Sequence, residues 1–191
     1  MQSGLTADEK TYLLRLAREA IRAAVEQKPP PRLDASQLTA ALTAPGASFV
    51  TLTKQGYLRG CIGALAANQP LAEDIREHAA AAALEDPRFP PVRPAEVPDL
   101  HIEISRLTEP QPLNYQSPED LLSLIRPMVD GVILRDGFRR ATFLPQVWKQ
   151  IPKPADFLGQ LCRKMGASPD LWRQKVLEVA VYQVEEFEEL K

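Results

Sequence analysis

The sequence predicts an α+β fold in which a mixed, mostly antiparallel sheet is flanked by helices. Two pairs of apolar runs, within 47–63 and 131–144, are each joined by a short glycine-containing turn, which is typical of β-hairpins. Segments with helical periodicity lie at 7–27 and 70–84. Strands and helices do not alternate regularly, so a parallel βαβ arrangement is not expected.

Length and composition describe a soluble protein. A chain of 191 residues can bury a sizeable core. The net charge of −2 and the lack of a dense Lys/Arg run disfavour a nucleic-acid ligand. No window approaches the ~20 apolar residues of a membrane span, and the first 28 residues do not read as a signal peptide. Two cysteines make no disulfide framework, so we expect a cytoplasmic protein with reduced thiols.

The first predicted helix has a clear start and a clear end. Thr6 and Glu9 form a capping box ahead of an amphipathic stretch over about 7–27. The run Pro29-Pro30-Pro31 ends that helix. A short helical turn is expected around 36–42.

The first predicted hairpin joins strands at about 47–53 and 57–63. Its register should keep apolar side chains together on one face. A three-residue loop over 54–56 achieves this, with Gly56 in the left-handed position of a bulged turn. A two-residue loop would set Val50 opposite Cys61 and mix the two faces. The preferred register pairs Val50 and Leu52 with Leu58, Gly60 and Ile62.

Further elements follow along the chain. Pro70 opens a helix that runs to about Leu84. The prolines of 86–91 exclude a helix there and predict a rigid, extended loop. Alternation over 100–107 predicts a strand, and Pro118 starts a short helix that ends near Arg126. The remaining predicted elements are a hairpin of 131–135 and 138–144 turned at Asp136-Gly137, helical segments at 145–150 and 155–165, and a central strand over 176–187.

The stretch 56–63 carries the strongest chemical signal. Arg59 and Cys61 are two residues apart in a predicted strand, so they share a face. A cation beside a thiol favours the reactive thiolate. Gly60 and Gly63 leave room for a ligand or for another backbone to come close. Cys61 is therefore the candidate nucleophile, and the alternative is a small buried residue.

Three other residues, Asp86, Arg88 and Glu103, complete the candidate site. Arg88, held between prolines, is a pre-ordered cation that could bind a carboxylate or phosphate, or instead pair with Asp86. Glu103 is a candidate general base or a partner of Arg59, with a solvated strand residue as the simpler interpretation. Arg139 and Arg140 follow a tight turn and should be exposed.

The other thiol and the two histidines favour structural roles or stay open. Cys162 lies on the apolar face of a predicted helix and is assigned to the core. His78 is assigned as a hydrogen-bonded core histidine, whereas His101 is open to either interpretation. Their spacings contain no local zinc-ligand pair, so no metal is expected. No Walker loop, dinucleotide fingerprint or G-x-S-x-G elbow is present, and no cofactor is expected.

Blocks along the whole chain resemble the AMME chromosomal region gene 1 protein family (the AMMECR domain). The hexapeptide Leu58-Arg59-Gly60-Cys61-Ile62-Gly63 (LRGCIG) is the most specific. Lys164-Met165-Gly166 departs from the more usual Lys-Ala-Gly. The other blocks are Phe49-Val50-Thr51-Leu52, Pro70-Leu71, Ala82 through Asp86-Pro87-Arg88-Phe89-Pro90-Pro91-Val92, Ile102-Glu103-Ile104-Ser105, Asp130-Gly131-Val132, Thr142-Phe143-Leu144-Pro145-Gln146-Val147, and Phe157-Leu158 to Leu161-Cys162-Arg163-Lys164.

The resemblance implies one domain over 1–191 with a larger lobe, a smaller lobe at about 111–170, and a cleft near the hexapeptide. The family has no firmly established activity. Its prokaryotic members often occur beside a Memo-like protein and a radical S-adenosylmethionine (SAM) enzyme, which implies them as partners.

Two functional hypotheses follow. The first is a cysteine-dependent enzyme, or enzyme subunit, acting on a small anionic substrate. The second is a non-catalytic binding module for a peptide, a cofactor or one of those partner proteins. In the first hypothesis the catalytic residues are Cys61, Arg59 and Glu103, and the substrate-binding residues are Arg88, Asp86, Gly60 and Gly63.

Overall fold

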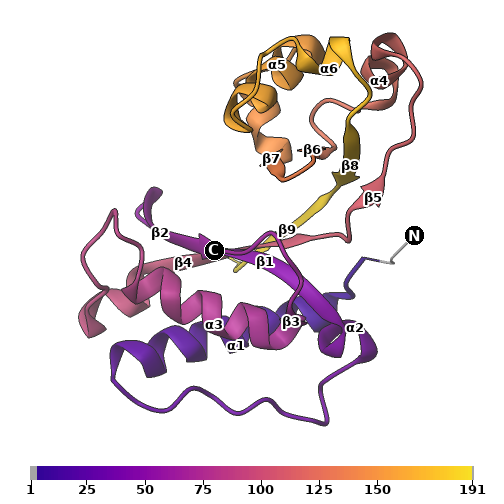
Figure 1. The fold of residues 1–191 in the computed structure, drawn as a ribbon. Helices are drawn as coiled ribbons and strands as arrows, with labels where there is room; N and C mark the ends of the chain where they lie inside the picture. The colour runs from indigo at the N-terminus through magenta and orange to yellow at the C-terminus, as the bar shows by residue number, and fades with distance from the viewer. Residues whose placement is uncertain (1–3, 191) are drawn as a thin grey trace. The chain divides into compact units, whose positions relative to one another are not determined.

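The computed structural model describes residues 4–190 of the chain, in two compact units (Figure 1). Of the described residues, 4–107 together with 185–190 make up the first unit, and Thr108–Val184 the second. The second unit includes the 111–170 segment that the family resemblance implies as a smaller lobe. Each unit builds an antiparallel sheet and packs helices on it, which confirms the predicted α+β class.

The first unit contains the sheet with strand order β2-β1-β4-β9, and the short strand β3 pairs with β1. The predicted helix over 70–84 and the predicted strand over 100–107 are both confirmed. The strands are β1 (Pro45–Lys54), β2 (Tyr57–Gly63), β3 (Gln69–Pro70), β4 (Leu100–Leu107) and β9 (Val184–Glu188), and the helices are α1 (Ala7–Val25), α2 (Ala40–Thr43), α3 (Leu71–Leu84) and the 3₁₀ helix η1 (Pro94–Asp99).

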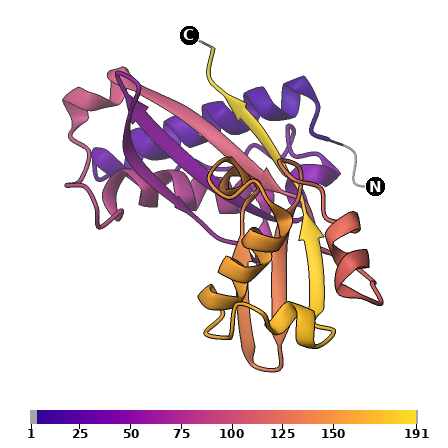
Figure 2. The same ribbon diagram turned by 90° about the horizontal axis from the view of Figure 1, so that it is seen from above.

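Helices α1 and α3 cover one face of this sheet (Figures 1 and 2). The Thr6–Glu9 capping box that starts α1 is present in both directions, with N–H···O distances of 2.7 and 3.2 Å. Alternate strand residues point at the helices and form the core, among them Val50 and Ile104, which are fully buried. The other face of the same strands is only partly buried.

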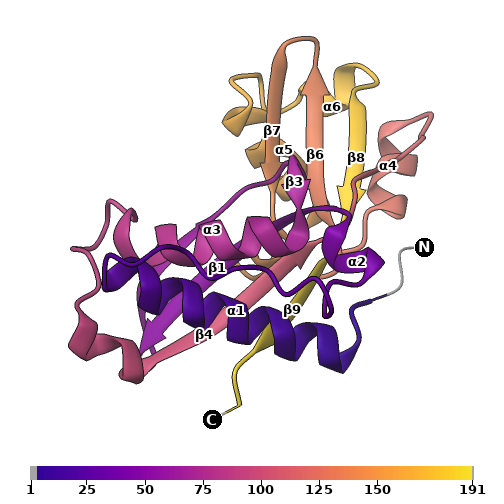
Figure 3. The same ribbon diagram turned by 90° about the horizontal axis from the view of Figure 1, so that it is seen from below.

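The second unit contains a sheet with strand order β5-β8-β6-β7, of which β8, β6 and β7 lie side by side in Figure 3. Its core lies between one face of that sheet and α5, where the Trp148 and Phe157 rings stack with centroids 3.6 Å apart. Its elements are β5 (Gln111–Pro112), α4 (Pro118–Leu124), β6 (Gly131–Asp136), β7 (Arg139–Phe143), the 3₁₀ helix η2 (Pro145–Lys149), α5 (Pro154–Lys164), α6 (Leu171–Gln174) and β8 (Glu178–Tyr182).

The first hairpin has the expected pairing but a different turn. Val50 pairs with Ile62 and Leu52 with Gly60, as predicted. The loop nevertheless has two residues, Gln55 and Gly56, both at positive φ. A bulge at Arg59, and not a longer loop, produces the apolar register. The predicted three-residue loop is therefore wrong, although Gly56 does take the left-handed conformation.

Three other predictions also need correction. The second hairpin turns at Gly137-Phe138 because Asp136 pairs with Arg139, so its turn is one residue later than predicted. The apolar run 176–187 is not one central strand: it forms β8 in one sheet and β9 at the end of the other. The loop of 86–91 is not fully extended, because Asp86–Phe89 forms a tight turn closed by a 3.1 Å bond from the Phe89 N–H to the Asp86 carbonyl.

No helix in residues 4–190 has the length and apolar character that a membrane span requires. Within the same residues, no group of three or more His, Cys, Asp or Glu side chains is arranged to hold a metal ion.

Candidate functional site

The candidate site lies on the face of the first sheet that α1 and α3 leave uncovered. Thr51 pairs with Cys61 on one side and with Glu103 on the other, so the three residues form a row across β2, β1 and β4. The Thr51 hydroxyl donates a hydrogen bond to the Cys61 sulfur over 3.3 Å. Since neighbouring strands are separated by about 4.8 Å, Cys61 and Glu103 are about 10 Å apart across the sheet.

Side chains of the Asp86–Phe89 turn replace a neighbouring strand at the free edge of β2. The Cys61 N–H donates to Asp86 Oδ2 over 2.8 Å, and Arg88 Nη2 donates to the Cys61 carbonyl over 3.4 Å. Asp86 and Arg88 are joined by further bonds of 2.6 and 2.9 Å. At Cys61 the backbone groups of the β2 edge are therefore satisfied and are not available to pair with another chain.

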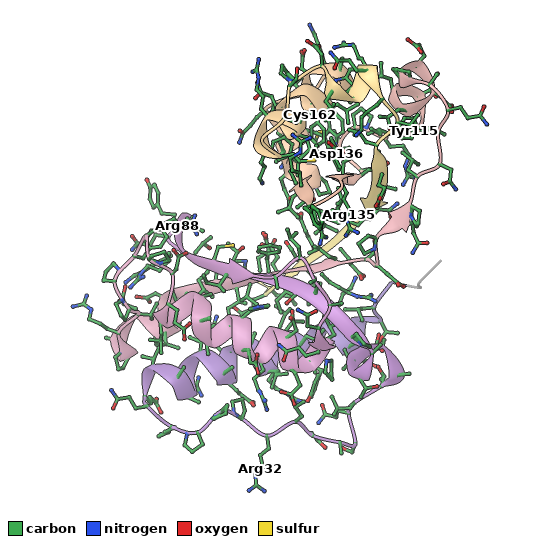
Figure 4. All side chains as sticks on the ribbon, viewed as in Figure 1. Arg32, Arg88, Tyr115, Arg135, Asp136 and Cys162 are labelled. Atoms are coloured by element: carbon green, nitrogen blue, oxygen red, sulfur yellow. The ribbon has the colours of Figure 1, made fainter. Side chains whose placement is uncertain are left out.

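The local sequence explains this turn. Asp at the first position and Pro at the second favour a tight turn, which brings the Arg88 side chain back onto Asp86. The Asp86 carboxylate is almost fully buried, and the bonds from Arg88 hold its pKa well below the usual range. The same carboxylate raises the pKa of Arg88, and the Cys61 sulfur adds to that effect. Half of the Arg88 side chain stays exposed at the edge of the first unit (Figure 4).

Arg59 is the extra residue of the β2 bulge, and its guanidinium is occupied. It bonds to both carboxylate oxygens of Glu96 at 3.3 Å and to the Pro90 carbonyl at 2.9 Å. These contacts lower the pKa of Glu96 to about 2, with the Arg59 bonds as the largest cause. The structure therefore joins Arg59 to Glu96 and to the loop that follows the Asp86–Phe89 turn.

Each glycine of the hexapeptide lies close to other atoms of the first unit, where a side chain would not fit. A Cβ on Gly60 would lie 2.1 Å from the Ala82 carbonyl oxygen of α3. A Cβ on Gly63 would lie 2.3 Å from the Ser48 carbonyl oxygen and 2.5 Å from the Phe49 ring. Of the two uses that the sequence left open for Gly60, the close approach of another backbone is present.

The remaining candidates lie apart from the thiol. His78 bonds to Asp74 at 3.1 Å, and Asp74 accepts a 2.6 Å bond from the buried Ser48 hydroxyl. His101 contacts Glu188. Within residues 4–190, no histidine is hydrogen-bonded to Cys61.

The second thiol is structural, as predicted. Cys162 is completely buried in the core of the second unit, and burial raises the pKa of its thiol. Arg139 and Arg140 are exposed, also as predicted.

Three residues that the sequence singled out, Cys61, Asp86 and Arg88, are thus hydrogen-bonded to one another in the fold. Sequence reasoning missed Glu96 as the partner of Arg59. The sequence did contain a signal for the local structure around Glu96. In Arg93-Pro94-x-Glu96, the proline at the first helical position and the glutamate two residues later indicate the start of a helix.

Comparisons with known proteins agree on one family. The AMMECR1 family model matches residues 14–187. A protein of Methanothermobacter thermautotrophicus is 40% identical over 186 residues, covering 97% of this chain and 96% of its own. A protein of Methanopyrus kandleri is 38% identical over 203 residues, covering 99% and 92%. The crystal structure of an uncharacterized protein from Pyrococcus horikoshii superposes with a TM-score of 0.80 at 32% identity, covering 97% of this chain and 93% of that one.

Proposed function

This chain belongs to the AMMECR1 family, and from that premise we propose that it is a cysteine-dependent enzyme, or a subunit of one, acting on a small anionic substrate through Cys61. One observation carries the proposal. Each polar group of Cys61 has a side-chain partner: Asp86 binds its N–H, Arg88 its carbonyl and Thr51 its sulfur. A reactive group needs this kind of fixed position.

Arg88 is the cation best placed to bind the substrate's negative charge. It uses Nε and Nη2 for Asp86, while its Nη1 makes no hydrogen bond to any residue within 4–190. Arg59 has the weaker case for this role because Glu96 occupies it. Asp86 then serves to position Cys61 and Arg88.

Glu103 is placed to act on the end of the substrate that lies away from Cys61. It shares the partly exposed face with Cys61 and lies one strand beyond Thr51. At about 10 Å from Cys61 it is too distant to take the thiol proton directly, so it would act only on a substrate bound over Thr51, between the two residues. We assign it the acid or base that acts on the substrate.

The test compares two alkylating reagents on the folded protein in a Cys162→Ala background. Iodoacetamide is neutral and iodoacetate is anionic, so their rate ratio reports a nearby positive charge. We expect Cys61 to react with both before unfolding, with a preference for iodoacetate relative to a free model thiol. Arg88→Gln should abolish the preference and Arg88→Lys should keep part of it. Arg32→Gln, which removes an exposed arginine on the opposite side of the first unit from Arg88 (Figure 4), should leave it unchanged.

Two results would contradict the proposal. Labelling of Cys61 only after denaturation would make it a structural residue. An iodoacetate preference that survives Arg88→Gln would remove Arg88 from the substrate site. Circular dichroism of each variant separates these results from misfolding.

A binding module for a Memo-like or radical SAM partner is the second candidate, because the residues next to the site expose apolar surface. Tyr57 is 79% exposed and Leu58 is 43% exposed at the start of β2. In this case Tyr57→Ser should weaken binding to the purified partner from the same organism, and Cys61→Ala should leave binding unchanged. Equal binding by the wild type and Tyr57→Ser would exclude this surface.

A further inference from the structure

A pocket of about 570 Å³ lies in the second unit, and all of the described residues that line it belong to that unit. The pocket is of ordinary size for a small-molecule site. Strand register places its principal side chains on one face of the sheet. Ile133 of β6 pairs with Ala180 of β8, and Arg135 pairs with Arg140 on one side and Glu178 on the other. The opposite face of these strands packs on α5 and forms the core.

The charges in this pocket are unbalanced. Arg135 and Arg140 occupy directly opposite positions on neighbouring strands, an arrangement that is destabilising for like charges. Glu178 approaches Arg135 only to 3.9 Å, with both side chains at least half exposed. Arg140 makes no hydrogen bond or ion pair with any residue within 4–190. Two arginines and one glutamate therefore leave one positive charge.

The carboxylate that follows Arg135 in the sequence is already paired with other cations. Asp136 follows Arg135 on β6 (Figure 4). It bonds instead to Lys175 and to Arg139, each at 2.5 Å. Asp136 does not line the pocket. The excess charge in the pocket consequently stays available for a ligand.

The remaining wall is largely apolar. Pro110 and Pro112 come from the segment leading through β5, and Val176 precedes β8. Together with Ile133 and Ala180 they give the pocket a hydrophobic surface next to its two arginines. Such a combination binds a molecule with an anionic head and an apolar body.

We propose that this pocket is a binding site for a small monocarboxylate with an apolar body. A carboxylate can accept parallel hydrogen bonds from a guanidinium, and a single negative charge matches the single unbalanced positive charge. A phosphate dianion matches that charge less well. The site belongs to the second unit and does not depend on the role proposed for Cys61.

The experiment titrates the full chain with 3-phenylpropionate and follows backbone amide shifts by NMR. We expect binding in the millimolar range typical of a small fragment, with shifts concentrated on β6, β7 and β8. The neutral analogue 3-phenylpropanamide should bind at least about tenfold more weakly because it cannot accept charge-assisted bonds. Inorganic phosphate, the third probe, should bind more weakly than 3-phenylpropionate.

Three variants are expected to differ in their affinity for 3-phenylpropionate. Arg140→Gln should weaken 3-phenylpropionate binding about tenfold or more. Glu178→Gln should tighten it, because it raises the unbalanced charge from one to two. Arg163→Gln removes an exposed arginine of α5 outside the pocket and should change nothing.

Several outcomes would overturn the proposal. Absence of saturable shifts on β6, β7 and β8, or equal affinity for the amide, would exclude a carboxylate site. Tighter binding of phosphate would replace the monocarboxylate with a phosphoryl ligand. Equal weakening by Arg140→Gln and Arg163→Gln would show only general charge attraction.

Discussion

Two pairs of arginines, one in each unit, meet very different surroundings. Arg59 and Arg88 at the β2 edge each bind a carboxylate, Glu96 and Asp86 respectively, whose own side chain is largely buried. Arg135 and Arg140 of the β6–β7 hairpin face each other, with one weak acidic neighbour. The number of cations is the same, but only the second pair leaves charge unbalanced.

This difference in pairing gives a criterion that distinguishes structural arginines from arginines available to a ligand. A guanidinium that satisfies a buried carboxylate contributes to folding, because removing it leaves a buried charge unpaired. A guanidinium held opposite another one costs stability and favours an anion that relieves the repulsion. By this criterion both Arg59 and Arg88 contribute to folding. Arg88 differs in that its side chain is half exposed and its Nη1 remains available to a ligand.

The largest expected effect tests how tightly the β2 edge is built. Gly60→Ala should lower the free energy of unfolding by about 3 kcal/mol or more, because its Cβ would lie 2.1 Å from the Ala82 carbonyl oxygen. Gly137→Ala in the other hairpin is the matched control. Its φ is +60° but no atom lies within 4 Å of the added Cβ, so about 1 kcal/mol is expected. Urea denaturation measures both, and equal losses would show that the two hairpins are packed alike.

A smaller effect tests the buried ion pair of Arg59. Glu96→Gln should cost about 2 kcal/mol near neutral pH, because it removes charge-assisted bonds. The folded pKa of Glu96, about 2, is below its ordinary value of 4.5, so its stabilisation is complete above 4.5 and is lost as pH falls towards 2. The wild type should therefore lose more stability than Glu96→Gln over that interval. Parallel pH profiles of the two proteins would mean that Glu96 contributes no net charge interaction.

The smallest effect has the opposite sign. Arg140→Gln should raise the free energy of unfolding by about 0.3 kcal/mol, because it ends the repulsion with Arg135. Arg59→Gln is the comparison and should lower it, since Glu96 loses its principal partner. Thermal unfolding at low salt resolves the difference. A loss of stability in Arg140→Gln would indicate that its guanidinium has a structural partner after all.

The sequence predicted local elements well because their signals are local. The capping box, the opening proline of α3 and the alternation of β4 each depend on neighbouring residues. The division of 176–187 between two sheets could not be predicted, because apolar alternation looks the same whichever sheet a strand joins. The bulge at Arg59 escaped for a similar reason: one inserted residue on β2 and one extra loop residue give the same apolar register.

In the candidate site, too, contacts between residues close in sequence could be predicted and contacts between distant residues could not. Asp86 and Arg88 are two residues apart, so their pairing could be weighed from sequence. Arg59 and Glu96 are 37 residues apart, and no periodicity relates them. The pocket around Arg135 and Arg140 depends on which strand lies beside which, and sheet order is a property of the whole fold.

The position of β9 has a consequence for synthesis on the ribosome. The first unit uses Glu185 to bind the Leu5 N–H and Lys10, and Glu189 to bind the Ile102 N–H. Both glutamates leave the ribosome after all of Thr108–Val184. Until then β4 presents an unpaired edge and Lys10 lacks its counter-ion, so the unit that begins to emerge first is completed last.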